Sequence, residues 1–240
     1  MGAALDRGQI EKAYARWAPV YDLVFGTVFE RGRMAAIEAA EKHCGAAGGR
    51  ILEVGVGTGI SLSDYSRNNK ICGIDISEGM LMKAQERVAE HKMTHVEGLW
   101  VMDAEHLTFQ DNSFDVVMAQ YVITTVPNPE ATLTELARVL KPGGEIILCS
   151  RVGAEAGLRR TLEKLFTPVA RKLGWRTEFS FERYTNWAQS TPGMRLVERR
   201  AMPPLGHFSL IRFGKVADGS AGSQTQAATA SQTPLRRAAG

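Results

Sequence analysis

Three glycines at alternate positions, preceded by an acidic residue, have the spacing of a ligand-binding loop. The stretch ILEVGVGTGISL places Gly55, Gly57 and Gly59 directly after an apolar run. Residues without a side chain let a ligand approach the main chain, and the N–H groups at the start of a following helix can face it. Glu53 stands just before the first glycine. Its carboxylate suits a cationic group of a ligand or an ordered water.

Two more acidic residues follow the next apolar runs. Asp75 ends the run KICGID and Asp103 follows HVEGLWVM. A carboxylate at the end of the second strand can accept hydrogen bonds from both hydroxyls of a ribose. Two alternatives remain open at this point: a glycine turn that binds no ligand, and an Asp75 that only caps a helix starting at Ser77.

The glycine pattern differs from two common nucleotide-binding motifs. In G-x-G-x-x-G the third glycine would fall at the position of Ile60 rather than at Gly59, and no GK[ST] sequence follows for a phosphate-binding loop. The pattern therefore disfavours a nicotinamide dinucleotide or a nucleoside triphosphate as the ligand.

Short apolar runs alternate with segments of helical periodicity between residues 49 and 150. The runs are RILEV, KICGI, HVEGLWVM, FDVVMAQ and GEIILCS, and the helical segments are residues 60–68, 77–91 and 129–140. This alternation predicts a doubly wound, mostly parallel α/β sheet. Residues 141–144 are expected to form a turn. Two later runs, MRLVERRAM and HFSLIRFGKV, predict an antiparallel pair that completes seven strands.

Length and composition indicate one domain with extensions. The chain has 240 residues, is 44% hydrophobic and carries a net charge of +3, which provides no general field for nucleic acid. We expect an N-terminal helical lid at 1–44, a core at 45–217 with a basic insertion at 155–176, and a disordered tail at 218–240. Three separated cysteines and no apolar run of ~20 residues predict a cytoplasmic protein without a metal site or a membrane span.

The motifs taken together resemble a known family. EVGVGTG, GIDIS with Met80, MDAEHLTF, FDVVMAQYVI and LKPGGEIIL are similar, in this order and spacing, to those of class I S-adenosylmethionine-dependent methyltransferases. The resemblance implies a Rossmann-like fold and S-adenosylmethionine as cofactor, with S-adenosylhomocysteine as product. It also implies cofactor contacts: Glu53, Gly55, Gly57, Gly59 and Gln120 at the methionine part, Asp75 at the ribose, and Ile76, Met80, Asp103, Ala104 and Glu105 around the adenine.

Two flanking segments have amphipathic patterns. In the first, Ile10, Ala13, Tyr14 and Trp17 share one face of a helix. The second, RRTLEKLFTPVARKLGWR, combines an apolar stripe with six basic residues, a pattern typical of segments that bind an anionic membrane surface. The alternative is that both are helices packed on the core. The sequence AQYV after FDVVM lacks the motif of nucleic-acid amino-methyltransferases.

The flanks and the core together resemble bacterial phospholipid N-methyltransferases, which convert phosphatidylethanolamine stepwise to phosphatidylcholine. This resemblance implies a phospholipid substrate, peripheral association with the inner face of the cytoplasmic membrane, and a monomer. Two alternatives remain: a quinone C-methyltransferase, whose N-terminal Y-D element resembles VYDLVF, and a non-catalytic, cofactor-regulated membrane-binding protein.

Methyl transfer to an amine needs positioning more than a strong base. Aromatic rings suit an acceptor that becomes a quaternary ammonium, because cation–π attraction does not need N–H donors. Tyr14, Tyr21 and Tyr121 are therefore the candidate catalytic residues. For the lipid phosphate, the sequence offers Arg183 and the pair Arg159 and Arg160 as candidates.

Overall fold

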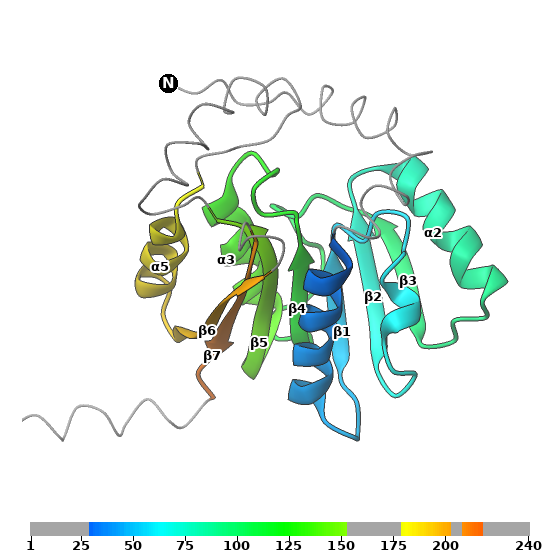
Figure 1. The fold of residues 1–240 in the computed structure, drawn as a ribbon, viewed down its shortest axis with the longest axis horizontal. Helices are drawn as coiled ribbons and strands as arrows, with labels where there is room; N and C mark the ends of the chain where they lie inside the picture. Colours follow the sequence, from blue (N-terminus) through cyan, green and yellow to red (C-terminus); the bar gives the residue numbers. More distant parts are fainter. Residues whose placement is uncertain (1–28, 153–178, 203–207, 218–240) are drawn as a thin grey trace, which may run out of the picture.

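The computed structural model describes residues 29–152, 179–202 and 208–217, and these form a layered α/β structure around one sheet (Figure 1). The strand order across the sheet is β3-β2-β1-β4-β5-β7-β6. Strands β1 to β5 pair in parallel, whereas β7 is antiparallel to both β5 and β6. The predicted mostly parallel, seven-stranded, doubly wound sheet is therefore confirmed. The strands are β1 Arg50–Val54, β2 Lys70–Asp75, β3 Val96–Val101, β4 Phe114–Gln120, β5 Leu140–Arg151, β6 Met194–Met202 and β7 Phe208–Lys215.

Helices cover both faces of the sheet (Figure 1). On one face lie the helical residues 29–44 and α2, and on the other lie α3 and α5. The two faces follow the alternation of side chains along the strands: Val117 and Ala119 of β4 pack with α3 and α5, while Val116 and Met118 pack with residues 29–44. The helix bounds are α2 Glu78–Glu90, α3 Pro129–Val139 and α5 Phe181–Ser190.

The central strands are apolar on both sides because helices cover both. In β1, Ile51, Leu52 and Val54 are completely or almost completely buried. The edge strand β3 is different, with half-buried and exposed positions such as Trp100 and Val101. Continuous apolar runs are typical of buried parallel strands, which explains why the sequence located β1, β2, β4 and β5 well.

Two helices begin at residues that reduce the number of unsatisfied N–H groups. Ser77 precedes α2, and its Oγ accepts the N–H of Met80 at 3.4 Å. Pro129 opens α3, where the missing N–H of proline costs nothing. These signals place both helices directly after the loops that follow β2 and β4, at the carboxyl edge of the sheet.

The structure corrects two local predictions and adds one helix that the sequence did not predict. Residues 60–68 do not form a helix but only the short 3₁₀ turn Leu62–Asp64, because polar side chains there bond to main chain, as Ser66 Oγ does to the N–H of Asn68. Strand β5 extends through the expected turn at 141–144, with an irregular register opposite β4. Helix α5 was not predicted, although Tyr184, Trp187 and Ala188 have helical spacing and are buried.

The helical residues 29–44 lie close to the sheet. A Cβ at Gly32 would overlap the Tyr121 hydroxyl and lie 2.7 Å from Cys149 Sγ, so only glycine permits this approach. The remainder of the predicted lid, the 155–176 insertion and the 218–240 tail lie outside the described residues. Within the described residues, no helix has the length and apolarity needed to cross a membrane.

Candidate cofactor and acceptor site

The glycine loop connects β1 to the 3₁₀ turn at the carboxyl edge of the sheet. The N–H groups of Gly55 and Val56 both donate to Ile74 O, at 2.8 and 3.0 Å, which ties the loop to β2. A side chain at Gly55 would overlap Val122, and one at Gly59 would lie 2.9 to 3.0 Å from Leu62 and Ala84. All three glycines have a positive φ, and Gly57 differs in its surroundings: no atom of the described residues lies within 4 Å of a Cβ built there. Gly55 and Gly59 therefore permit packing, and Gly57 presents bare main chain to open space.

Asp75 holds the glycine loop against the end of β2. Its Oδ2 accepts the N–H of Gly57 at 2.9 Å and its Oδ1 accepts the N–H of Ser77 at 2.9 Å. Burial raises the pKa of Asp75, and hydrogen bonds from main-chain N–H groups oppose that shift. Each carboxylate oxygen accepts more than one hydrogen bond. Asp75 can therefore order the loop and still accept the hydroxyls of a ligand.

Glu53 lies beneath the loop and is only 3% exposed. Its two oxygens accept hydrogen bonds from Ser61 Oγ at 2.6 Å and from the Tyr65 hydroxyl at 2.8 Å. Burial raises the pKa of Glu53 to about 7, and the two hydrogen bonds and the charge of Arg33 oppose the shift. A buried carboxylate with this pKa responds to a cation placed beside it, because a nearby positive charge favours the ionised form.

The other predicted cofactor residues surround the ends of β2, β3 and β4. Ile76 is 40% exposed beside Asp75, as expected for an apolar contact with a ligand, whereas Met80 is only 4% exposed. Asp103 and half-buried Ala104 form the turn after β3, in which Asp103 Oδ1 accepts the N–H of Glu105 at 3.1 Å. Gln120 ends β4, with its Nε2 at 3.1 Å from Met118 Sδ.

Glu105 also has a structural partner. Its two carboxylate oxygens accept the main-chain N–H and the side-chain Nδ2 of Asn128, at 2.9 and 2.8 Å. Asn128 immediately precedes α3. These bonds link the loop after β3 to the start of α3, so Glu105 fixes the position of that loop.

Tyr121 follows β4 in a strained conformation. Its φ is +62°, a region that side-chain-bearing residues seldom occupy. Its N–H donates to Cys149 O at 2.6 Å, and its hydroxyl donates to Phe29 O at 3.2 Å. The ring lies 4.2 Å from that of Phe29 and 5.2 Å from that of Phe208, centroid to centroid. We call Phe29, Tyr121 and Phe208 the aromatic cluster. Tyr14 and Tyr21 lie outside the described residues.

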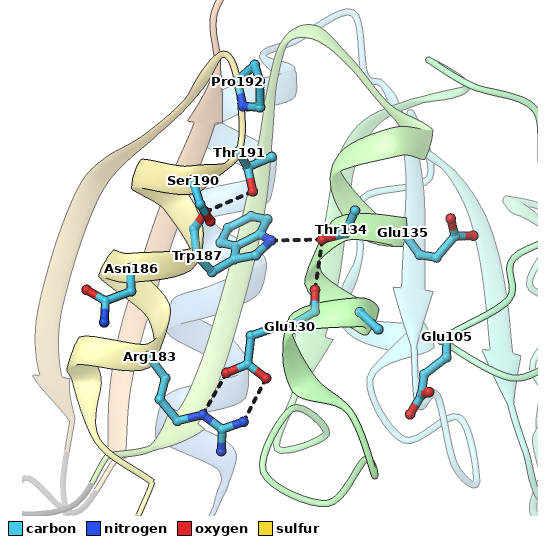
Figure 2. Close-up of a pocket in the computed structure, with 11 residues that line it drawn as sticks. Glu105, Glu130, Thr134, Glu135, Arg183, Asn186, Trp187, Ser190, Thr191 and Pro192 are labelled. Carbon is cyan, nitrogen blue, oxygen red and sulfur yellow. Dashed lines mark hydrogen bonds and ion pairs between the residues drawn. The ribbon is translucent and has the colours of Figure 1, made fainter.

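A groove of about 860 Å³ lies between α3 and α5 (Figure 2). Arg183 spans it with two hydrogen bonds to Glu130, both of 2.7 Å, and also stacks over Phe179. Trp187 Nε1 donates to Thr134 Oγ1 at 3.2 Å across the same groove. Arg183 therefore already has a carboxylate partner on the face opposite the helical residues 29–44. This arrangement does not support Arg183 as the phosphate ligand. The alternative pair, Arg159 and Arg160, lies outside the described residues.

Comparison with known proteins identifies the family. A family described as a methyltransferase domain matches residues 52–148. A phosphatidylethanolamine N-methyltransferase from Cereibacter sphaeroides is 40% identical over 206 residues, which cover 85% of this chain and 96% of the relative. The chain belongs to the class I S-adenosylmethionine-dependent methyltransferases. The predicted family and cofactor are thereby confirmed.

Other relatives of this methyltransferase match less of the chain or with lower identity. A demethylmenaquinone methyltransferase from Symbiobacterium thermophilum is 40% identical over 104 residues, 42% of this chain and 41% of the relative. A solved methyltransferase from Thermotoga maritima, described as a possible histamine N-methyltransferase, has a TM-score of 0.61 and 25% identity over 85% of this chain and 99% of its own. The quinone enzymes thus share only part of their length with this methyltransferase.

The residues at the carboxyl edge fit S-adenosylmethionine. Gly57 offers open space above bare main chain, Asp75 offers carboxylate oxygens suited to ribose hydroxyls, and Ile76 offers exposed apolar surface suited to a base. These three residues lie at or just after the ends of β1 and β2. The chain adds β2 and β3 on one side of β1 and β4 on the other, so the strand order reverses between β1 and β4. In open α/β sheets, ligands bind at such a reversal.

Sequence reasoning missed two residues beneath the loop. Ser61 and Tyr65 satisfy both oxygens of Glu53 and come from the segment wrongly predicted to be a helix. Their contact depends on how the chain turns between β1 and β2. No spacing rule in the sequence indicates that turn, and the role of the two residues was therefore visible only in the structure.

We expect Asp75→Ala to weaken binding of S-adenosylhomocysteine by about 1 to 3 kcal/mol, through loss of charge-assisted hydrogen bonds to the ribose. Calorimetric titration measures the affinity, and Asp111→Ala is the matched control because Asp111 is an exposed carboxylate away from the loop. Unchanged affinity in a folded Asp75→Ala variant would remove Asp75 from the cofactor site.

The raised pKa of Glu53 predicts a pH-dependent stability. The carboxyl titrates near 4.5 in the unfolded chain and at about 7 in the folded one, so the folded protein binds this proton more tightly. The free energy of unfolding should then fall as pH rises from about 4.5 to 7, by on the order of 1 to 3 kcal/mol. Urea unfolding across this range should show that Glu53→Gln flattens the slope.

A control separates this effect from other carboxyl groups. Glu97 is largely surface-exposed, and its hydrogen bond with Arg50 lowers its pKa. Glu97→Gln should therefore leave the slope above pH 5 unchanged. An equal slope in the wild type and in Glu53→Gln would show that Glu53 is not the group responsible.

Proposed function

We propose that this methyltransferase transfers methyl groups from S-adenosylmethionine to the amine of phosphatidylethanolamine and of its methylated intermediates, towards phosphatidylcholine. The observation that carries the proposal is the extent of the match to the Cereibacter sphaeroides enzyme, which includes sequence outside the cofactor-binding core. The demethylmenaquinone methyltransferases match over a much shorter stretch. A quinone acceptor is therefore the less supported alternative.

The acceptor amine must be neutral when it attacks. An alkylamine has a pKa close to that of lysine, about 10.4, so the neutral form at pH 7 costs roughly 4 to 5 kcal/mol. The bound cofactor supplies an electrophilic methyl group. The protein lowers the cost by removing the amine from water, since desolvation disfavours the ammonium form. The aromatic cluster at the ends of β4 and β7 provides such an apolar surface.

Tyr121 supports this chemistry with its ring. Burial raises the pKa of its hydroxyl far above the normal range, so the hydroxyl remains protonated. A protonated phenol that donates to Phe29 O is no general base. The contribution we propose for Tyr121 is therefore apolar and cation–π contact with the headgroup, which persists when methylation has removed the last N–H.

The proposed substrate places the protein at a lipid surface. We propose peripheral, reversible association with the anionic inner face of the cytoplasmic membrane by a monomer. The support is the sequence pattern of the two amphipathic flanks, 10–17 and 159–176, which lie outside the described residues. Basic residues near an anionic leaflet contribute about 1 kcal/mol each, screened by salt.

We expect incubation with labelled S-adenosylmethionine and mixed lipid vesicles to label phosphatidylcholine and its mono- and dimethylated precursors. Chromatography of the extracted lipids identifies the product. Label confined to a quinone would favour the quinone alternative. Binding of S-adenosylhomocysteine without any labelled product would instead favour the non-catalytic membrane-binding protein.

Substitutions of Tyr121 test the role of its ring. Tyr121→Phe should retain most of the turnover on phosphatidylethanolamine, because the ring remains. Tyr121→Leu should lower kcat/KM about 3- to 30-fold, the effect of losing a cation–π contact. Unchanged S-adenosylhomocysteine affinity in both variants is the control for an intact core. Equal turnover in the Leu variant and the wild type would exclude the ring from the acceptor site.

A further inference from the structure

Arg151, the last residue of β5, has a polar atom that the fold leaves unsatisfied. Its Nε lies out of contact with solvent and has no hydrogen-bond partner in the part of the chain that the structure describes. Buried polar groups normally have a partner, and an unpaired donor is unfavourable. A ligand that accepts hydrogen bonds would supply the missing partner.

The strand register places Arg151 beside the aromatic cluster. In the antiparallel pairing of β5 and β7, Arg151 lies opposite Phe208 and Cys149 lies opposite Leu210. Directly opposed residues project from the same face of a sheet, and so do residues two apart on one strand. Leu210 packs in the core cluster with residues 29–44. Arg151 therefore lies on the same face as Phe208, the ring that contacts Phe29 and Tyr121.

The neighbouring strand ends place Arg151 at the same edge of the sheet as the cofactor loop, with β4 between β5 and β1. Gln120 at the end of β4 lies opposite Cys149 of β5, and the N–H of Tyr121 donates to Cys149 O. Strand β4 in turn pairs with β1, which leads into the glycine loop. Arg151, with its unsatisfied Nε, and the proposed cofactor site thus lie at the same edge of the sheet.

Many other arginines have carboxylate partners. The described ion pairs to Asp or Glu involve Arg33, Arg50, Arg138, Arg183, Arg200 and Arg212. A guanidinium already paired with a carboxylate would have to lose that partner before binding another anion. Arg151 has no such ion pair within the described residues and can bind an anion without losing one.

We propose that Arg151 binds the phosphate of the phospholipid acceptor while the aromatic cluster contacts its amine. The inference rests on the proposed function and deepens it, because it assigns the headgroup to a specific place. A guanidinium presents N–H donors in a planar fork that matches two oxygens of a phosphodiester. In an ethanolamine headgroup, a short ethylene link separates the phosphate from the amine, so a cation and an aromatic surface side by side suit the two ends.

The test measures binding of a soluble headgroup independently of methyl transfer. Calorimetry of the full chain saturated with S-adenosylhomocysteine compares glycerophosphoethanolamine with ethanolamine, which lacks the phosphate. Arg151→Gln should weaken binding of the phosphate-bearing probe about 10- to 100-fold, the loss expected for hydrogen bonds to a charged group. Arg151→Lys should retain part of the affinity, because it keeps the charge but not the fork. Ethanolamine binding should change little in either variant.

Arg195→Gln on the edge strand β6 is the matched control. Arg195 is exposed and lies on the far side of β7 from β5, so its removal changes net charge equally without touching the site. Its affinity for glycerophosphoethanolamine should remain within about twofold of the wild type. The melting temperature of ligand-free Arg151→Gln should stay close to that of the wild type, because Arg151 has no ion pair to lose within the described residues.

Three results would overturn the inference: wild-type affinity in Arg151→Gln, an equal loss in Arg195→Gln, or a wild type that binds both probes alike. The proposed function can fail independently of this inference. A wild type that binds the probe through Arg151 but methylates no lipid would refute the function and leave the phosphate site standing. If the wild type methylates phosphatidylethanolamine and Arg151→Gln does so with the same KM, the phosphate site alone would be refuted.

Discussion

The parallel alignment of β1 between β2 and β4 is the constraint on which the whole site depends. Because both neighbours run in the same direction as β1, the carboxyl ends of the three strands meet at one edge. The chain goes from β1 to β2 on one side and returns to β4 on the other, which leaves the loops after these strands diverging around a shared space. Gly57, Asp75 and Gln120 reach that space from three different strands. Their proximity is a consequence of topology.

Buried charge then determines how the loop is held. Asp75 joins the glycine loop to the start of α2 through two main-chain N–H groups, and Glu53 joins the underside of the loop to Ser61 and Tyr65. Each carboxylate loses solvation on burial and regains part of it as hydrogen bonds. The loop is thus held by polar bonds to two buried carboxylates, while a Cβ built at Gly57 would meet no atom of the described residues.

The proposed acceptor side is built from elements of the other half of the sheet. Antiparallel β7 brings Phe208 next to Arg151, and the helical residues 29–44 bring Phe29 over Tyr121. The positive φ of Tyr121 and the absence of a side chain at Gly32 both serve this close approach. Strain at Tyr121, in the proposed acceptor site, is consistent with a surrounding structure that holds one side chain in place.

The sequence by itself determined the fold class, the family and most strands, because continuous apolar runs and glycine spacing are local signals that survive without tertiary context. It also located the acids Glu53, Asp75 and Asp103 at consecutive strand ends.

The sequence was misleading at residues 60–68, where Tyr65 turns inward to Glu53 instead of continuing a helix. It also did not distinguish among the arginines, since charge and spacing do not reveal partners. Tertiary structure decided that Arg183 is paired with Glu130 and that the Nε of Arg151 is buried without a partner among the described residues. The physical reason is that both outcomes depend on contacts between segments distant in sequence, and no periodicity or motif encodes those contacts.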